Sequence, residues 1–434
     1  MPSSTAERYD VNAVIGGLLR DLAFAQASQQ KMYGYKRAAA AILALPEPLT
    51  DLAGPDGSLP RIPGIGPGST RIIREVLDTG GSPTVELAVA RSERRSDIQR
   101  RRSLRSHFLS RAEVLRVLSD RAASSNVGPG SVGATSSSVG PGSVGATSSS
   151  VGPGSFGASS DAPRPTARHR KDDPTGPGST SLVDRGSYRG DFQMHSEWSD
   201  GAPTMEEIVE ACLERGYQYA AVTDHSHGLK IAGGMSMADA ARQRRAIDAV
   251  NERYEGRFRL FQGIEANIDV NGGLDLTPDE AAQFEIVLAA PHARLRKDED
   301  QTPRMLAAIE HAHVRILAHP RGRISGSRGG VVADWDAVFA AAAKRGVAVE
   351  IDGDPARQDL DYTLARRALD AGCVFAVDSD AHTTAQLSYA ETGLAHARLA
   401  SIPADRIVNC WPLERLLAWL ADPSRESNRP ASDF

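Results

Sequence analysis

The apolar and polar positions of the chain follow a helical period over its first part. Residues 11–25 place apolar side chains at the three- and four-residue spacing of an amphipathic helix. Residues 35–45 are rich in the helix formers alanine and leucine, and residues 69–77 continue a helical pattern. We therefore expect a small all-α unit, which we bound at residues 10–121.

The pattern changes from residue 190 onward, where short apolar runs alternate with helical segments. This alternation is typical of a parallel α/β architecture. The sequence marks both ends of the helix after the first run. Thr204 and Glu207 form a capping box at its start, and Gly216 follows its end. We bound this α/β unit at residues 188–422. The predicted strands are 191–194, 219–223, 257–262, 286–290, 315–318, 347–351 and 374–377.

A sequence repeat separates the two units. VGPGSVGATSSS occupies residues 127–138, recurs at 139–150 and begins again at 151. Glycine, serine and proline in this proportion cannot bury enough apolar surface to offset the entropy of ordering. The sequence therefore predicts a disordered linker over residues 122–187, which tethers the two units at high effective concentration.

Composition and charge restrict the class of protein. The chain has a net charge of −5 and no long uncharged apolar run, and its start lacks the pattern of a signal peptide, so we expect a cytoplasmic protein without membrane contact. The three cysteines, Cys212, Cys373 and Cys410, are scattered in apolar segments and are expected to be buried thiols. Residues 91–121 carry ten arginines against four acids, which suits either a solvated helix face or a phosphate-binding surface.

A glycine-rich turn precedes the helical pattern at 69–77. Its sequence is LPRIPGIGPG at residues 59–68, and glycines let a backbone approach a phosphate while the first helical N–H groups point at it. The arrangement resembles the helix-hairpin-helix motif of X-family DNA polymerases, which implies that Gly64, Gly66, Gly68 and Arg71 contact the DNA backbone without reading its sequence. A purely structural turn is the alternative. The resemblance also places Ile72 where lyase-competent relatives carry lysine, so no lyase activity is expected from this unit.

Histidines and carboxylates follow almost every apolar run of the α/β unit. Because the carboxyl ends of parallel strands open onto one face of a barrel, these residues are expected to converge there. Imidazole nitrogens and carboxylate oxygens together suit zinc, manganese or iron, and so many ligands imply more than one ion. The candidates are His195, Asp200, Asp224, His225, Glu265, His292, His319, Glu350, Asp352, Asp378, Asp380 and His382.

These motifs, GDFQMHSEWSDG, VTDHSHGLKIAGG, GIEANI, PHARL, LAHPRG and DSDAH, resemble those of the PHP (polymerase and histidinol phosphatase) superfamily, and most of all the PHP domain of bacterial X-family polymerases. The resemblance implies a distorted (β/α)7 barrel with two to three divalent ions. It assigns Gln193, His195, Glu265 and Asp380 to the first metal, Glu265, His292 and His319 to the second, and Asp200, His225 and His382 to the third.

One ligand position departs from the family, because Gln193 stands where histidine is usual. An amide oxygen is a poorer ligand than imidazole for zinc-like ions, so the first position should bind weakly or prefer a harder ion such as manganese. Either the enzyme works with this altered site, or it has lost activity and keeps the fold for binding. We favour the active interpretation, because loss of function should have damaged several buried polar groups rather than one.

The resemblance implies hydrolysis of phosphoric esters, with Glu265, Asp380 and Arg321 as candidate catalytic residues. Cations near the motifs are candidates for holding the substrate phosphate, and among Lys230, Arg294, Arg321 and Arg357 we favour Arg321. The remaining carboxylates are expected to orient ligand imidazoles rather than bind metal. These are Asp224, Glu350, Asp352 and Asp378.

X-family polymerases carry a palm between these two parts, and none is recognisable here, so polymerase activity is not expected. The favoured function is metal-dependent processing of DNA ends in repair, as a 3′–5′ exonuclease, a 3′-phosphatase or an abasic-site cleaving enzyme. One alternative is a small-molecule phosphatase of the histidinol-phosphate type. Another is a catalytically silent DNA-binding protein. The sequence does not specify the oligomeric state.

Overall fold

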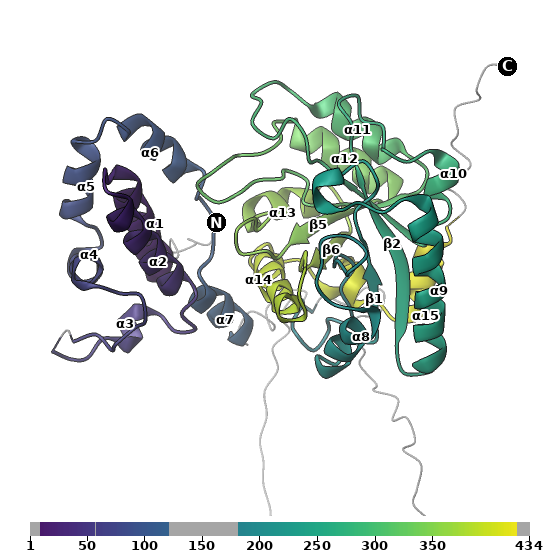
Figure 1. Cartoon of the computed structure of the whole chain (residues 1–434), viewed down its shortest axis with the longest axis horizontal. Helices are drawn as coiled ribbons and strands as arrows, with labels where there is room; N and C mark the ends of the chain where they lie inside the picture. Colours follow the sequence, from purple (N-terminus) through teal and green to yellow (C-terminus); the bar gives the residue numbers. More distant parts are fainter. Residues whose placement is uncertain (1–8, 57, 121–180, 423–434) are drawn as a thin grey trace, which may run out of the picture. The chain divides into compact units, whose positions relative to one another are not determined.

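The computed structural model describes residues 9–56, 58–120 and 181–422 (Figure 1). Most of the predicted linker, residues 122–187, therefore lies outside the described residues. Where the description resumes, Leu182 already forms an antiparallel bridge with Pro403, and the Ala404 N–H donates to the Ser181 carbonyl at 3.0 Å. Residues 181–187 thus pack on the α/β unit rather than extending away from it.

The N-terminal unit is helical, as the apolar spacing predicts. Its second helix begins at Gln29, six residues before the predicted start, because the Ser28 side chain caps it by accepting from the Lys31 N–H. A core of aliphatic side chains, including Ile15, Leu19, Ile42 and Ile73, holds the helices together. The helices are α1 (Val11–Ala25), α2 (Gln29–Leu43), α3 (Leu49–Leu52), α4 (Pro67–Thr79), α5 (Pro83–Ala90), α6 (Arg95–Ser103) and α7 (Arg111–Ser119).

The C-terminal unit is built on a six-stranded parallel sheet whose strands pair in sequence order, β1 to β6. Every strand is buried over nearly its whole length, which explains why these runs are almost continuously apolar. Since all six strands run the same way, their carboxyl ends share one face. The strands are β1 (Tyr219–Val222), β2 (Arg259–Asn267), β3 (Ile286–Ala290), β4 (Val314–Leu317), β5 (Ala348–Asp352) and β6 (Phe375–Asp378).

The segment predicted as the first strand, residues 191–194, is not a continuous strand. It instead bridges the two edges of the sheet: the Ala221 N–H donates to the Asp191 carbonyl at 2.9 Å, and Met194 forms a parallel bridge with Ala381. A Cβ on Gly190 would lie 2.1 Å from the Tyr219 carbonyl oxygen, so only glycine fits this close approach. The segment therefore closes the six strands into a distorted barrel, with too few regular bonds to form a strand.

Helices surround the barrel (Figure 1). The capping box predicted for Thr204 and Glu207 is confirmed, with both reciprocal bonds formed, and Gly216 adopts a φ of +77° just past the helix. No helix among the described residues is long and apolar enough to cross a membrane. The helices are α8 (Met205–Glu214), η2 (Lys230–Ala232), α9 (Met237–Arg253), α10 (Pro278–Ala281), α11 (Thr302–Glu310), α12 (Trp335–Arg345), α13 (Tyr362–Asp370), η3 (Thr384–Tyr389), α14 (Ala390–Leu399), η4 (Ala404–Arg406), η5 (Val408–Cys410) and α15 (Leu413–Leu420).

The inside of the barrel is divided along its axis. Toward the amino ends of the strands it is filled by apolar side chains, among them Phe192, Tyr219, Phe261 and Trp411. Toward the carboxyl ends the buried side chains are histidines and carboxylates. All three cysteines are buried thiols, as expected. The fold thus places a polar cluster on an apolar floor at one end of the barrel.

Candidate metal centre

The carboxyl ends of the strands bring eight predicted ligands together. Glu265 lies within β2, while the others stand one to six residues past a strand or past the closing segment. Three overlapping groups have ligand atoms that all lie within 4.8 Å of one another. They are His195, Asp200, His225 and His382; His225, Glu265 and His292; and His195, Glu265 and Asp380.

Glu265 occupies the middle of the cluster. Its Oε1 lies 2.8 Å from His319 Nε2 and 3.2 Å from His292 Nε2. Its Oε2 lies 3.2 Å from His225 Nδ1 and 3.4 Å from His195 Nε2. Each carboxylate oxygen thus faces two imidazole nitrogens, which is the geometry of a carboxylate bridging two metal positions.

Asp200 and His382 form the more open side of the cluster. Asp200 Oδ1 lies 3.4 Å from His382 Nε2 and 3.6 Å from His225 Nε2, and its side chain is 36% exposed. The His195 ring stacks between those of His225 and His382, at centroid distances of 4.4 and 4.3 Å. The cluster is therefore open to solvent at this third predicted metal position.

The electrostatics of the cluster suit cations. Glu265 is wholly buried, and although burial opposes its charge, the imidazoles of His225 and His292 hold the pKa of Glu265 well below its usual value. Burial likewise opposes charge on His195, but Asp380 and Glu265 outweigh it and raise the pKa of His195 to about 9. For His225 burial prevails and lowers the pKa to about 4, so this imidazole stays neutral.

Several buried polar atoms in the cluster make no hydrogen bond. They include His195 Nδ1, His319 Nδ1 and Glu265 Oε2. An unsatisfied buried polar atom costs on the order of 1–3 kcal/mol, and more when it is charged. Because these atoms belong to predicted ligands, divalent cations would satisfy the cluster, and the donor set of imidazole and carboxylate fits zinc, manganese or iron.

Two ligands hold unusual backbone conformations. His319 has a φ of +24° and Asp380 a φ of +52°, a region that side chains other than glycine rarely occupy. Each such residue costs on the order of 1–3 kcal/mol and persists only where its surroundings impose it. These backbone conformations direct both side chains toward the cluster.

Gln193 lies beside the three groups, wholly buried. In the orientation that satisfies its amide, the nitrogen donates to both carboxylate oxygens of Glu350, at 2.9 Å to Oε2. Glu350 also accepts from the backbone N–H of His319. Gln193 is thus linked through Glu350 to the loop that carries the ligand His319. A neutral imidazole at this position has a single N–H and could make only one of the two hydrogen bonds to Glu350.

The expectation that Asp224, Glu350, Asp352 and Asp378 orient ligand imidazoles is wrong. Asp224 accepts from the Ser196 hydroxyl at 2.6 Å and from the Gln243 amide at 2.7 Å. Asp378 accepts from the Phe192 N–H at 2.7 Å, and burial raises its pKa to about 6. These carboxylates are bonded to the backbone and side chains of the loops that carry the ligands, because the barrel interior supplies N–H and O–H groups there.

The imidazoles are oriented by groups that the sequence did not single out. His292 Nδ1 contacts Asn267 Oδ1 at 2.5 Å, and His382 Nδ1 contacts the Asp380 carbonyl at 2.9 Å. Asn267 donates in turn to Asp275 at 2.6 Å. Asn267 lies two residues after Glu265, the spacing of side chains on one face of a strand, and this spacing is the signal that could have identified it.

Arg357 is the candidate cation nearest the ligands. Its Nε lies 3.2 Å from Asp380 Oδ2 and 3.5 Å from Asp352 Oδ2. Burial works against its charge, but Asp380 and Asp352 outweigh burial and raise the pKa of Arg357 above its usual value. Arg321, favoured from the sequence, donates to Asp361 at 3.3 Å, and Arg294 pairs with Glu299. The geometry therefore favours Arg357 over Arg321 for contact with a bound phosphate.

The glycine turn of the N-terminal unit opens α4. Gly64 has a φ of +86°, which requires glycine, and no side chain caps α4 at Gly66. A hollow beside it is lined by Gly66 and Thr70, by the cations Arg71 and Arg74 and by the acids Glu75 and Asp78, among others; the Arg71 side chain is 70% exposed and pairs with Glu75. The uncapped start of the helix and two guanidinium groups thus border one hollow, an arrangement that can contact a phosphate backbone.

Part of the arginine-rich run is paired with carboxylates. Arg102 and Arg105 both pair with the buried carboxylate of Asp21, at 2.5 Å for Arg102. Arg100 pairs with Asp97 at 2.7 Å. Because these paired arginines have a structural role, the hairpin is the better candidate for contact with a polyanion.

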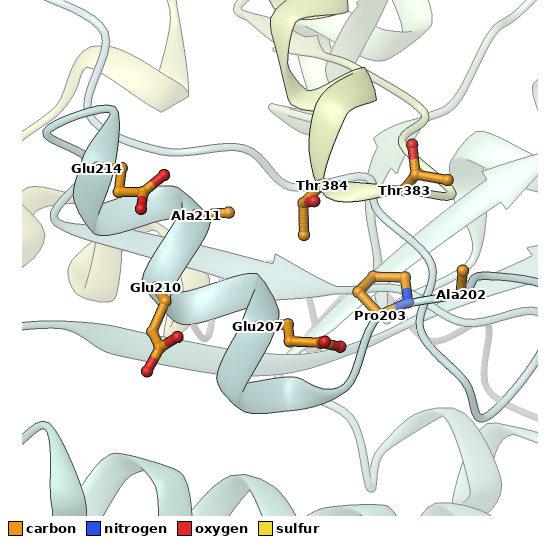
Figure 2. Close-up of a pocket in the computed structure, with 8 residues that line it drawn as sticks. All are labelled: Ala202, Pro203, Glu207, Glu210, Ala211, Glu214, Thr383 and Thr384. Atoms are coloured by element: carbon orange, nitrogen blue, oxygen red, sulfur yellow. The ribbon is translucent and has the colours of Figure 1, made fainter.

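A second hollow lies near the metal loops, between α8 and the Thr383–Thr384 segment (Figure 2). Glu207, Glu210 and Glu214 line it from successive turns of α8. It adjoins the cluster, because the Ala202 N–H donates to the His382 carbonyl at 2.9 Å. Three carboxylates repel a phosphate group, so the substrate phosphate is not expected in this hollow.

A distorted parallel barrel with five histidines and three carboxylates gathered at its strand ends defines a barrel protein with a candidate metal centre. Comparison with known proteins identifies the family. Residues 191–326 match the PHP domain and residues 11–82 match a helix-hairpin-helix domain, HHH_8. The chain belongs to the PHP superfamily.

Individual relatives each match about half of the chain. The DNA polymerase/3′-5′ exonuclease PolX of Bacillus subtilis is 37% identical over 243 residues, which cover 56% of this chain but only 42% of that protein. A probable phosphatase of Tolumonas auensis is 30% identical over 237 residues, covering 52% of this chain and 91% of the relative. A solved histidinol phosphate phosphatase of Lactococcus lactis aligns with a TM-score of 0.36 and 14% identity, over 48% of this chain and 94% of that one.

Proposed function

We propose that this protein hydrolyses phosphoric esters at DNA ends, as a 3′–5′ exonuclease, a 3′-phosphatase or an abasic-site cleaving enzyme in repair, and that it does not polymerise DNA. The observation that carries the proposal is the presence, on one chain, of the metal-type cluster and of a hairpin suited to a DNA backbone. The exonuclease activity in the name of the Bacillus subtilis relative supports it. DNA is bound through its backbone, without sequence specificity.

The proposed site residues have distinct roles. Two to three ions are expected. The first would be held by His195, Gln193, Glu265 and Asp380, and the second by Glu265, His292 and His319. The third would be held by Asp200, His225 and His382. Zinc, manganese or iron held there would lower the pKa of water and would offset the charge that develops on the phosphate. Arg357, fixed by its carboxylate neighbours, donates to a phosphate oxygen as that charge grows.

Gln193 tunes the site rather than ending its activity. Its amide nitrogen is engaged by Glu350, which leaves only the weakly basic amide oxygen for an ion. The first position should then bind its ion less tightly than an all-imidazole site and should favour manganese over zinc. The other eight ligand positions keep imidazole or carboxylate groups, which supports an active enzyme.

A small-molecule phosphatase is the second candidate function. It is favoured by the relatives named as probable phosphatases, which match about half of this chain over almost their own whole length. In that case the helical unit would contribute nothing to turnover. A catalytically silent DNA-binding protein is the third candidate.

Reversing the charge of the hairpin separates the first two candidates. We expect the double change Arg71→Glu and Arg74→Glu to raise KM for a 3′-labelled duplex by about tenfold or more, because two cations beside the phosphate-binding turn become repulsive. Hydrolysis of p-nitrophenyl phosphate should be unchanged. Steady-state kinetics on both substrates at fixed salt measure the difference.

A matched control is Arg366→Glu. Arg366 is likewise an exposed helical arginine paired with an acid four residues on, Asp370, but it lies on α13 of the barrel. It should leave both substrates unaffected. Equal rates of the hairpin variant and the wild type on DNA would contradict the proposal, as would efficient phosphomonoester hydrolysis without metal-dependent release from 3′-labelled DNA.

A further inference from the structure

An isoleucine beside the metal centre is almost fully exposed. Ile231 lies in the middle of the short turn η2, in the loop between β1 and α9, and 96% of its surface is open to solvent. It is the most exposed large apolar residue of the described part of the chain. The turn also carries two exposed polar side chains, Lys230 and His227.

The turn is held by many short contacts. The Met235 N–H donates to the carbonyl of the ligand His225 at 2.8 Å, which closes the loop at its base. Within the loop, the Leu229 N–H donates to the Ser226 carbonyl at 3.0 Å. A Cβ on Gly234 would lie 1.9 Å from the same carbonyl oxygen, so the two arms of the loop are in direct contact. Ile231 is therefore displayed by a closed turn.

The turn is also connected to a second ligand. The Ser226 hydroxyl donates to Asp275 at 2.7 Å, Asp275 accepts from Asn267, and Asn267 contacts His292. On its other side Gly233 packs against the backbone of Ser199, the residue before the ligand Asp200. The turn thus contacts the loops that carry the ligands and lies at the edge of the cluster's open side.

Burying an isoleucine side chain stabilises a folded protein by about 1.5–3 kcal/mol. In the free protein the Ile231 side chain is left in water and contributes none of this stabilisation. Apolar side chains that proteins present to DNA pack against nucleobases or insert between base steps. The neighbouring Lys230 can meet a flanking phosphate. A small phosphomonoester has no base to cover Ile231.

We propose that Ile231 packs against the terminal nucleobase of a DNA 3′ end whose phosphate lies at the metal centre. This rests on the proposed action on DNA ends and adds to it a preference for a 3′-terminal nucleotide that carries its base. Ile231 is then a specificity-determining residue, and the closed turn holds it ready before substrate arrives.

The test uses the full chain and two 3′-labelled duplexes that differ only in the terminal nucleotide, one ordinary and one with an abasic tetrahydrofuran. The wild type should show a KM about tenfold lower for the ordinary end, the difference expected from burying one aliphatic side chain. In Ile231→Ala this preference should nearly vanish, while kcat/KM for p-nitrophenyl phosphate stays unchanged. The thermal unfolding midpoint should also be unchanged, because the side chain is exposed.

Leu417→Ala is the matched control. Leu417 is 44% exposed on α15, and that helix lies at the opposite end of the barrel, since the Leu420 carbonyl accepts from Arg315 beside the start of β4. This variant should keep the wild-type preference for a base.

Three results would overturn the inference in distinguishable ways. Hydrolysis of DNA with the same base preference in wild type and Ile231→Ala contradicts the contact alone. A parallel loss on both DNA ends and on p-nitrophenyl phosphate shows that the turn supports the metal loops instead. No hydrolysis of either duplex by the wild type refutes the proposed function itself, and the contact with it.

Discussion

Replacing Glu265 with glutamine is expected to lower kcat/KM on every phosphate ester by at least about a thousandfold. This carboxylate faces four imidazole nitrogens, from His195, His225, His292 and His319, within 3.4 Å. Glutamine keeps the shape but removes the charge and one acceptor oxygen, so two adjacent metal positions lose their shared ligand. Kinetics on p-nitrophenyl phosphate and on 3′-labelled DNA measure the loss.

Glu285→Gln is the control for the removal of a half-buried carboxylate outside the cluster. Glu285 pairs with Arg244 and Arg259 just before β3, outside the cluster. Its replacement should cost some stability but leave kcat/KM within about twofold, because Glu285 pairs with Arg244 and Arg259 rather than with any predicted ligand. If Glu265→Gln kept more than a tenth of the wild-type activity, Glu265 would not bridge the reacting ions.

Replacing Arg357 with alanine is expected to lower kcat/KM by about a hundredfold on both substrates. Its guanidinium is fixed by Asp380 and Asp352 beside the predicted ions, so it stabilises charge on the phosphate without reorganising. Arg357→Lys should recover only part of the loss, since an ammonium cannot make the same paired contacts. The fall should appear mainly in kcat, because the charge develops in the transition state.

Arg321→Ala is the informative comparison. Its guanidinium contacts Asp361 and the Gly329 carbonyl. It should therefore reduce activity by about tenfold at most. If Arg321→Ala lowered activity more than Arg357→Ala, the sequence-based choice of Arg321 would be supported and the geometric argument for Arg357 would be contradicted.

The barrel and the convergence of its ligands could be predicted from the sequence, because both follow from local patterns. Parallel strands buried on both faces are almost continuously apolar, and a histidine or carboxylate just past each strand must meet the others on one face. His195, Glu265 and Asp380, far apart in sequence, indeed come within 4.8 Å.

The features that escaped prediction depend on contacts between distant residues. The segment at residues 191–194 closes the barrel with only one or two backbone hydrogen bonds to each sheet edge, which apolar periodicity cannot distinguish from a strand. Asn267 orients His292 and Asp224 binds serine side chains, because of how their loops meet. Arg102 and Arg105 of the arginine run pair with Asp21, which lies some eighty residues earlier.

The central claim is that the cluster is a working multinuclear metal site despite Gln193. Its most direct test is the metal content of the purified full-length protein, measured by mass spectrometry after dialysis and again after loading with manganese or zinc. We expect at least two ions per chain, a further weakly held ion that manganese fills more readily than zinc, and loss of hydrolysis when chelators remove them. Fewer than two ions per chain under all loading conditions would contradict the claim.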